Sequence, residues 1–159
     1  MIQFAPSPGM VLMCDFRGLI EPEMTKVRHV AVLSPRRRRQ HGTCLVVPFS
    51  TVAPNPIESY HHRIPANSYS FFKRDTDVWA KADMITHVSL ARLDRVLDGG
   101  KYCSPKLQPS DLECIQLAVW EALAKPFPLL LAGSRSVQIA ETTVIERVEI
   151  SLDNLSPKK

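Results

Sequence analysis

Three short apolar runs near the start of the chain predict β-strands. The first, residues 11–14, follows a Pro-Gly turn pair; the second, residues 29–33, stops at a Ser-Pro pair; the third, residues 44–47, ends at Pro48. Turn residues at the ends of such runs are typical of strands. The apolar residues of the second and third runs are almost continuous, which indicates strands that are buried on both faces.

The middle of the chain predicts less regular structure. Prolines within residues 54–65 indicate an extended, irregular passage, and residues 79–88 return to a strand-like pattern. Residues 89–97 are expected to form a short helical turn, which the Asp-Gly-Gly sequence at 98–100 closes.

Residues 110–124 have a clear helical pattern. Ser110 and Glu113 form a capping-box pair, and Pro126 follows the end of the segment. Four apolar residues at helical spacing predict a buried face: Leu112, Ile115, Val119 and Leu123.

Beyond the helix, residues 137–139 and 147–153 alternate between apolar and polar, which predicts a terminal hairpin with one solvent-exposed face. Together these elements predict a mainly β (α+β) fold. We expect a small, strongly bent β-sheet or barrel with one packed helix.

Composition narrows the class of protein. The chain has 159 residues, 45% hydrophobic and 23% charged, which fits one globular domain and excludes a disordered chain. No apolar run approaches the roughly 20 residues of a membrane span, and no secretory signal is recognised, so we expect a cytoplasmic protein. The four cysteines form no CxxC pair and are interpreted as buried, reduced thiols. Motifs of common nucleotide and hydrolase sites are absent from the sequence.

The positive charge is concentrated in one place. Residues 1–75 carry 10 Lys/Arg and 5 Asp/Glu, whereas residues 76–159 carry 10 and 11. A run of four consecutive arginines equals the whole net charge of +4: Arg36, Arg37, Arg38 and Arg39. Such clusters attract polyanions, most often RNA or DNA. A solvated loop, or a contact with an acidic protein, explains the run equally well from the sequence alone.

Two groups of polar residues flank the predicted strands. Arg28, at the mouth of the second strand, presents a guanidinium group suited to phosphate oxygens; a salt bridge with Glu23 is the alternative interpretation. Ser50 and Thr51, which follow the third strand, can donate to an anionic oxygen or cap a turn.

A third group lies later in the chain. In an alternating strand, Lys81 and Asp83 share a face, which places a cation beside a candidate general base; a surface ion pair is the alternative. His61 and His62 are adjacent in a polar segment with no partner ligands at a zinc spacing, so no metal site is expected.

Taken in order, these pieces resemble the PemK/MazF family, the toxins of type II toxin–antitoxin modules. The matching stretches are residues 8–16, Glu23, 28–35, 44–51 and 81–86. We therefore divide the chain into a PemK/MazF-like toxin domain, residues 1–124, and a C-terminal extension, residues 125–159, packed on the same domain or on a dimer partner.

The resemblance implies a small Src-homology-3-like β-barrel of the CcdB/MazF/PemK type with a C-terminal helix, to which the terminal hairpin is an addition. It also implies a homodimer, a cognate antitoxin partner, and an mRNA interferase that cuts single-stranded RNA without metal or other cofactor. In such enzymes the ribose 2′-hydroxyl attacks the adjacent phosphorus, leaving a 2′,3′-cyclic phosphate and a free 5′-hydroxyl.

The resemblance further implies roles for single residues. Arg28 falls on the family's signature arginine and is expected to bind the scissile phosphate. Ser50 and Thr51 fall on the family's hydroxyl pair and are expected to donate to the same phosphate. The arginine run, 36–39, matches a variable family loop near the RNA groove.

The resemblance offers more than one candidate for the general acid and the general base. Asp83 matches the acidic residue proposed as base in the PemK branch, and Lys81 stands at an arginine position of that branch. Glu23 matches a family glutamate that orients the arginine or acts as alternative base. Pro22 stands where PemK-type toxins carry a histidine, and His29 replaces a proline, so the assignment of acid and base stays open.

The histidines at 61 and 62 are added to the arginine run as candidate RNA-binding residues. Two alternatives to a ribonuclease remain. One is a non-catalytic binding toxin of the same fold, as in the gyrase inhibitor CcdB. The other is a degenerate assembly protein, whose alternating residues 148–152 pair with another subunit as an edge strand.

Overall fold

The structure, a computed structural model, describes residues 2–34 and 42–123 and is mainly β within these ranges. The strands are β1 (Val11–Asp15), β2 (Val27–Val32), β3 (Thr43–Ser50), β4 (His61–Ile64), β5 (Val78–Lys81), β6 (Thr86–Ser89), β7 (Leu93–Asp94), β8 (Val96–Asp98) and β9 (Lys101–Cys103). Two 3₁₀ turns, η2 (Ala82–Met84) and η3 (Leu90–Arg92), flank β6, and the helix α1 (Pro109–Ala122) follows β9. The predicted fold class is confirmed.

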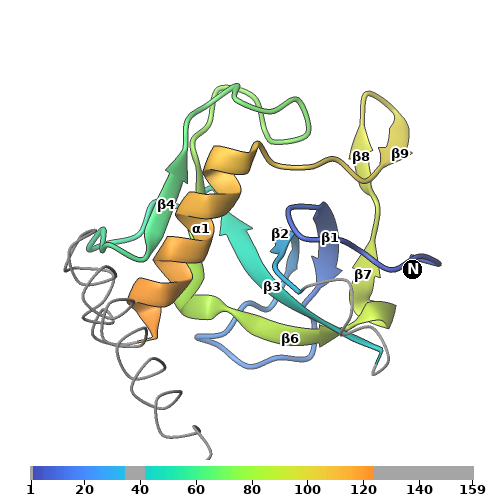
Figure 1. Cartoon of the computed structure of the whole chain (residues 1–159), viewed down its shortest axis with the longest axis horizontal. Coiled ribbons are helices and arrows are strands. Elements are labelled where there is room, and N and C mark those ends of the chain that lie inside the picture. The colour runs from blue at the N-terminus through green and yellow to red at the C-terminus, as the bar shows by residue number, and fades with distance from the viewer. Residues whose placement is uncertain (1, 35–41, 124–159) are drawn as a thin grey trace, which may run out of the picture. The chain divides into compact units, whose positions relative to one another are not determined.

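Seven strands form one sheet (Figure 1). Its order is β4-β5-β3-β2-β1-β7, and β6 also pairs with β3, whereas β8 and β9 form a separate hairpin. Among the described strands the sheet is open, because its edge strands β4 and β7 do not pair with each other. The barrel expected from the sequence is therefore a bent, open sheet in the described part of the chain.

Strand β3 changes partner along its length, which bends the sheet. Residues 43–46 pair with β6 and residues 49–50 pair with β5, while β2 occupies the other edge of β3. The sequence prediction ended this strand at Pro48, which is wrong, because the strand continues to Ser50. On the edge of β3 that faces β5 and β6, Pro48 lies between the segment paired with β6 and the segment paired with β5. Such a break in the pairing tolerates a residue without a backbone N–H.

The core lies on both faces of the sheet. Neighbouring residues of the three central strands are all fully buried and alternate between two clusters: Val11, Ala31 and Val47 in one, Leu12, Val30 and Val46 in the other. Ile115 of α1 belongs to the first cluster, and Phe16 and Leu93 belong to the second. Burial on both faces, predicted from the continuous apolar runs, is confirmed.

Helix α1 begins without the predicted capping box. Pro109 lies in its first turn, Gln108 is the N-cap residue and makes no side-chain cap bond, and Ser110 is already helical. Ile115 is fully buried, whereas Leu123 is 64% exposed. The buried face of the helix is therefore narrower than the apolar pattern indicated.

Asp111 joins α1 to the rest of the fold. Its carboxylate lies 3.0 Å from Nε2 of His62 in β4 and accepts a hydrogen bond from the hydroxyl of Tyr69. That hydroxyl accepts the N–H of Gln108 at 2.8 Å. Burial and the Asp111 carboxylate raise the pKa of Tyr69 to about 12. The start of the helix is thus fixed by a connected polar network.

Three further sequence predictions are corrected by the structure. Residues 79–88 are not one strand, because η2 separates β5 from β6. Strand β4 lies in the passage predicted to be irregular. The Asp-Gly-Gly sequence at 98–100 turns the β8–β9 hairpin and closes no helix; both glycines have positive φ, which such tight turns require.

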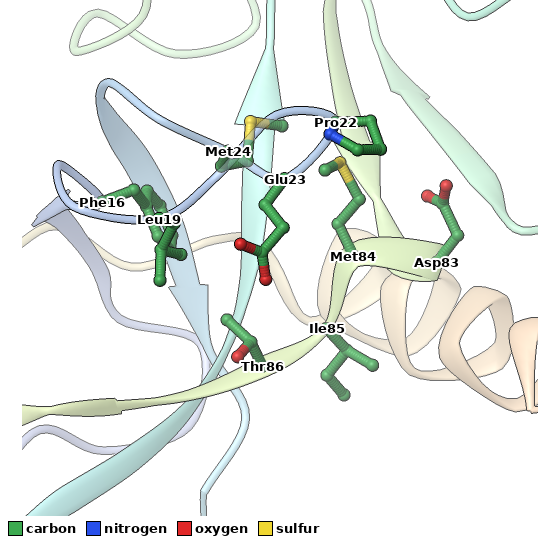
Figure 2. Close-up of a pocket in the computed structure, with 9 residues that line it drawn as sticks. All are labelled: Phe16, Leu19, Pro22, Glu23, Met24, Asp83, Met84, Ile85 and Thr86. Atoms are coloured by element: carbon green, nitrogen blue, oxygen red, sulfur yellow. The ribbon is translucent and has the colours of Figure 1, made fainter.

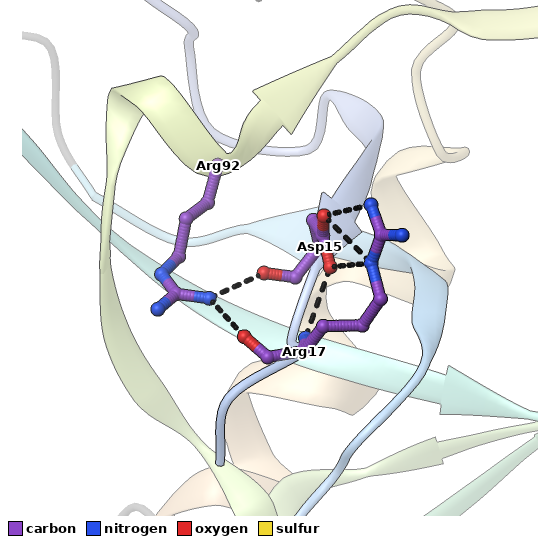
Figure 3. A network of polar contacts seen from close by, with 3 residues as sticks. All are labelled: Asp15, Arg17 and Arg92. Carbon is purple, nitrogen blue, oxygen red and sulfur yellow. Dashed lines mark hydrogen bonds and ion pairs between the residues drawn. The ribbon is translucent and has the colours of Figure 1, made fainter.

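A surface network ties the end of β1 to η3 (Figure 3). Arg92 donates to the backbone carbonyls of Asp15 and Arg17 at 2.8 and 3.0 Å, and the Arg17 guanidinium lies 2.6 Å from the Asp15 carboxylate. The hydrogen bonds from Arg17 hold the pKa of Asp15 at about 2.

The cysteines are free thiols, as predicted, but not all are buried. Cys14 and Cys44 lie in the core, where burial raises the pKa of Cys14 to about 12. Cys114 is exposed on α1, contrary to the prediction, because it lies on the helix face away from the core.

Some predictions fall on residues outside the described ranges. These are the arginine run at 36–39, the terminal hairpin, and the packing of the extension 125–159. In the part of the chain that is described, no helix is long and apolar enough to cross a membrane.

Candidate functional site

Arg28 and Ser50 lie on the same face of the sheet. Arg28 lies opposite Cys14 in the register of β1 and β2, and Val30 lies opposite Pro48 in the register of β2 and β3. Arg28 comes two residues before Val30, and Ser50 comes two residues after Pro48. Because side chains alternate between the two faces of a sheet, Arg28 and Ser50 lie on the same face as that pair.

The same face continues across β5 to β4. Ser50 lies opposite Trp79, and Lys81, two residues further along β5, shares that face. His61 of β4 lies directly opposite Lys81. Four predicted site residues from four strands, Arg28, Ser50, Lys81 and His61, therefore share one face of the sheet.

Arg28 is half-buried and keeps an unpaired donor. Its Nε atom is buried, and no group in the described part of the chain accepts a hydrogen bond from it. Glu23 is not its partner: among the described residues the two form no ion pair, and the Glu23 carboxylate accepts the N–H of Ile20 at 2.9 Å. A buried guanidinium N–H without an acceptor is costly, and an anionic ligand would remove that cost.

A pocket of about 220 Å³ lies at the ends of β2 and β3. Its polar lining residues are Arg28, Ser50, Thr51 and Lys73, and its wall is formed by Met13, Val27, His29, Phe49, Phe72 and Val78. Two cations and two hydroxyls around one pocket are a donor set that suits a phosphate group. Lys73 was missed by the sequence reasoning, because the segment that carries it has no pattern that places it beside Arg28.

The hydroxyl pair has two different environments. Ser50 is buried, and its Oγ accepts the N–H of Val52 at 3.1 Å, whereas Thr51 is exposed. The turn-capping interpretation is therefore correct for Ser50. A hydroxyl that accepts one hydrogen bond still has its own proton to donate, so capping and ligand binding are compatible.

His29 contributes to the wall of this pocket. Its ring packs edge-on against Phe72, with ring centroids 5.3 Å apart, and burial lowers the pKa of His29. Near neutral pH the ring is therefore uncharged.

The two candidate carboxylates line a second pocket, of about 310 Å³ (Figure 2). Besides Glu23 and Asp83, it is lined by Phe16, Leu19, Pro22, Met24, Met84, Ile85 and Thr86. Figure 2 shows the Glu23 carboxylate in the middle of the pocket near Thr86, with Asp83 at its side. The structure thus groups the carboxylates with each other, and groups Arg28 with the hydroxyls in the other pocket.

Lys81 and Asp83 are not two residues of one strand face, as the sequence predicted. Lys81 ends β5, and Asp83 belongs to η2, so strand alternation does not relate them. Lys81 is half-buried and Asp83 is exposed. Burial lowers the pKa of Lys81, and the Asp83 carboxylate opposes that shift.

His61 and His62 point to different partners. Nε2 of His61 lies 3.6 Å from Oδ1 of Asp83, while the ring of His62 lies against Asp111 of α1. These relationships depend on the pairing of β4 with β5 and on the packing of α1, so local sequence could not predict them. Within residues 2–34 and 42–123, no group of three or more metal-ligating side chains could hold a metal ion.

Comparison with known proteins identifies the family. A profile described as PemK-like, MazF-like toxin of type II toxin-antitoxin system matches residues 7–119. The chain belongs to this family. The match covers all six residues predicted to be catalytic and most of the described structure, including most of α1.

Several known proteins are similar to this chain in sequence or in fold. The YifN protein of Escherichia coli K12 is 31% identical over 143 residues, which is 77% of this chain and 94% of its own length. MazF of Deinococcus radiodurans has a TM-score of 0.58 at 15% identity, over 76% of this chain and 98% of its own. A mycobacterial endoribonuclease in complex with its cognate antitoxin has a TM-score of 0.51 at 20% identity, over 78% and 98%. At these identities the two solved structures establish the PemK/MazF fold for this chain.

Proposed function

We propose that this PemK/MazF toxin is a metal-independent endoribonuclease that cuts single-stranded RNA in the cytoplasm. The observation that carries the proposal is the buried, unpaired Nε of Arg28 beside a pocket lined by Ser50, Thr51 and Lys73. A phosphodiester anion in this pocket accepts from the guanidinium and from both hydroxyls, and Lys73 adds a further positive charge.

The proposed reaction forms one bond to phosphorus and breaks another. The ribose 2′-oxygen attacks, the bond to the 5′-oxygen breaks, and the products are a 2′,3′-cyclic phosphate and a 5′-hydroxyl. Arg28, Ser50 and Thr51 stabilise the charge on the phosphorane oxygens. A base must take the 2′-proton and an acid must protonate the departing 5′-oxygen.

We assign the base to Asp83 and the acid to Lys81, with Glu23 as the alternative base. Asp83 is exposed at the edge of the 310 Å³ pocket, where a ribose hydroxyl has access to it, and the RNA must therefore extend from the Arg28 pocket to this one. The lowered pKa of Lys81, caused by burial, suits an ammonium group that gives up its proton during the reaction. Glu23 is the weaker candidate, because its carboxylate already accepts the Ile20 N–H.

We further propose that the toxin is a homodimer and is neutralised by a cognate antitoxin. Support comes from family membership and from the mycobacterial endoribonuclease of similar fold, which forms a complex with its cognate antitoxin. Sedimentation velocity of the purified toxin, alone and with the protein encoded next to it, measures both associations.

A cleavage assay tests the function. Labelled single-stranded RNAs of varied sequence are incubated with the toxin in excess EDTA, and the product ends are identified. We expect cleavage with cyclic-phosphate ends, and a loss of about 10²–10³-fold or more in Arg28→Ala. Arg28→Lys tests the need for a planar guanidinium, and Arg95→Ala, far along the chain from this pocket, is the matched arginine control.

Two results would contradict the proposal. One is intact RNA at every sequence tested with folded wild-type protein; the other is Arg28→Ala protein that folds and still cuts at the wild-type rate. Inhibition of DNA gyrase without any RNA cleavage would instead favour a CcdB-like binding toxin.

A further inference from the structure

We propose that His61 is a positioning residue for Asp83: a buried, neutral imidazole that holds the carboxylate in the orientation in which it accepts the 2′-hydroxyl proton. The kinetic consequence rests on the proposed ribonuclease function, and the tautomer and contact of His61 can be measured without it.

The ring of His61 is fixed in orientation. Its side chain is only 6% exposed, and the ring of Tyr60 packs against it with centroids 4.6 Å apart. Its Nδ1 accepts the backbone N–H of Glu58 at 3.0 Å. Because Nδ1 uses its lone pair as an acceptor, the proton of the neutral ring is on Nε2.

Nε2 is also the ring atom that makes the contact with Asp83. Nε2 of His61 lies 3.6 Å from Oδ1 of Asp83, whose side chain is 42% exposed. A substrate can therefore reach the exposed Asp83 carboxylate, whereas the His61 imidazole is covered by protein. The separation is longer than a hydrogen bond, as is common for catalytic contacts before substrate binds.

The surroundings of His61 keep it uncharged. Lys81 lies directly opposite it in the β4–β5 register. Burial and the nearby Lys81 ammonium lower the pKa of His61, and the carboxylates of Asp83 and Glu58 only partly oppose them. A second proton could bind only at Nδ1, which would break the bond from Glu58. His61 thus offers a fixed donor to Asp83 and does not itself carry the proton away.

A double-mutant cycle tests this role. RNA cleavage is measured for His61→Ala and His61→Gln, each with Asp83 and with Asp83→Asn, and with His87→Ala as an exposed histidine control. In the proposal the contact between His61 and Asp83 shortens to a hydrogen bond in the RNA complex, and the loss of such a bond to a charged group predicts a loss in kcat of about 10- to 100-fold for His61→Ala, with little change in KM. The Gln side-chain amide can donate from a similar place, so His61→Gln should recover most of the activity.

In the Asp83→Asn background, His61→Ala should change kcat by less than about 2-fold, because its effect passes through the carboxylate. An equal loss in both backgrounds would mean that His61 only supports β4, and would overturn the proposal. So would unchanged kcat in His61→Ala, or a His61→Gln protein as inactive as His61→Ala, which would indicate proton transfer.

A second measurement does not depend on activity. Long-range ¹H–¹⁵N spectra of the histidine-labelled full chain at neutral pH should show His61 as the Nε2–H tautomer, and Asp83→Asn should shift its ring signals without shifting those of His87. An Nδ1–H or doubly protonated ring would overturn the proposal. If the wild-type toxin cuts no RNA, the proposed function fails, while these spectra still decide whether His61 is the Nε2–H tautomer in contact with Asp83.

Discussion

The hydroxyl of Ser50 accepts the backbone N–H of Val52 at 3.1 Å, at the edge of the pocket that Arg28 also lines. One side chain therefore ends β3 in a turn and retains a proton for a ligand. Thr51, the next residue, lines the same pocket but is exposed. The two adjacent hydroxyls can be separated by experiment, because only the first is part of the turn.

Ser50→Ala and Thr51→Ala should differ in stability but agree in activity. Removing the Ser50 acceptor should lower the free energy of unfolding by about 1 kcal/mol, and Thr51→Ala should change it by less than about 0.5 kcal/mol. Both should lower the rate of RNA cleavage, because both remove a donor to the phosphate. Urea denaturation and the cleavage assay measure the two effects; a larger stability loss in Thr51→Ala would contradict the assigned roles.

Asp83→Asn and Glu23→Gln distinguish the two candidate bases. Both changes keep side-chain shape and remove only the charge. Asp83→Asn should lower the single-turnover cleavage rate by about 10²–10⁴-fold, because general base catalysis is lost. Glu23→Gln should lower the same rate by less than about 10-fold, since the amide oxygen can still accept the Ile20 N–H. The reverse order of rates would make Glu23 the base.

The central sheet could be predicted from the sequence because its signals are local. The strands that carry Arg28 and Ser50 are continuous apolar runs bounded by turn residues, and their burial on both faces follows from that pattern. Both residues come at the ends of these strands, so their meeting on one face needed only the pairing of neighbours in sequence.

The surroundings of Asp83 could not be predicted in the same way. Strand β4 has the sequence His-His-Arg-Ile, which lacks the apolar alternation that indicates a strand. Only the pairing of β4 with β5 brings His61 opposite Lys81 and near Asp83. The sequence showed Pro22 where PemK-type toxins carry a histidine. The structure places the imidazole of His61, from β4, 3.6 Å from Asp83, which lines the same pocket as Pro22.

Tyr69→Phe should change how stability depends on pH at alkaline values. The pKa of Tyr69 is raised from 10.0 to about 12 by burial and the Asp111 carboxylate, so the folded state favours the protonated phenol. That contribution is complete below pH 10 and is lost as the pH rises to about 12, because the unfolded chain releases the proton first. The pKa of Cys14 is also raised to about 12, so Cys14 likewise lowers the free energy of unfolding at alkaline pH, in the wild type and in the variant alike.

Urea denaturation of both proteins between neutral pH and pH 12 measures the effect. The wild type should be more stable than Tyr69→Phe near neutral pH, where it keeps the bonds to Asp111 and Gln108. The two stability curves should converge as the pH approaches about 12. Parallel curves would show that the Tyr69 phenol does not resist ionisation in the folded state.

The salt dependence of RNA binding separates Lys73 from the arginine run at 36–39. Lys73 lines the pocket beside Arg28, so Lys73→Gln should lower both affinity and cleavage rate. Replacing all four arginines by glutamine should weaken binding without changing kcat.

For single strands, each lost phosphate contact reduces the slope of log K against log salt by about 0.7. Fluorescence anisotropy with a 2′-O-methyl oligonucleotide, which cannot be cut, measures this slope. An unchanged slope in the four-arginine variant would mean that the run does not contact RNA, and the cognate antitoxin would then be the partner to test.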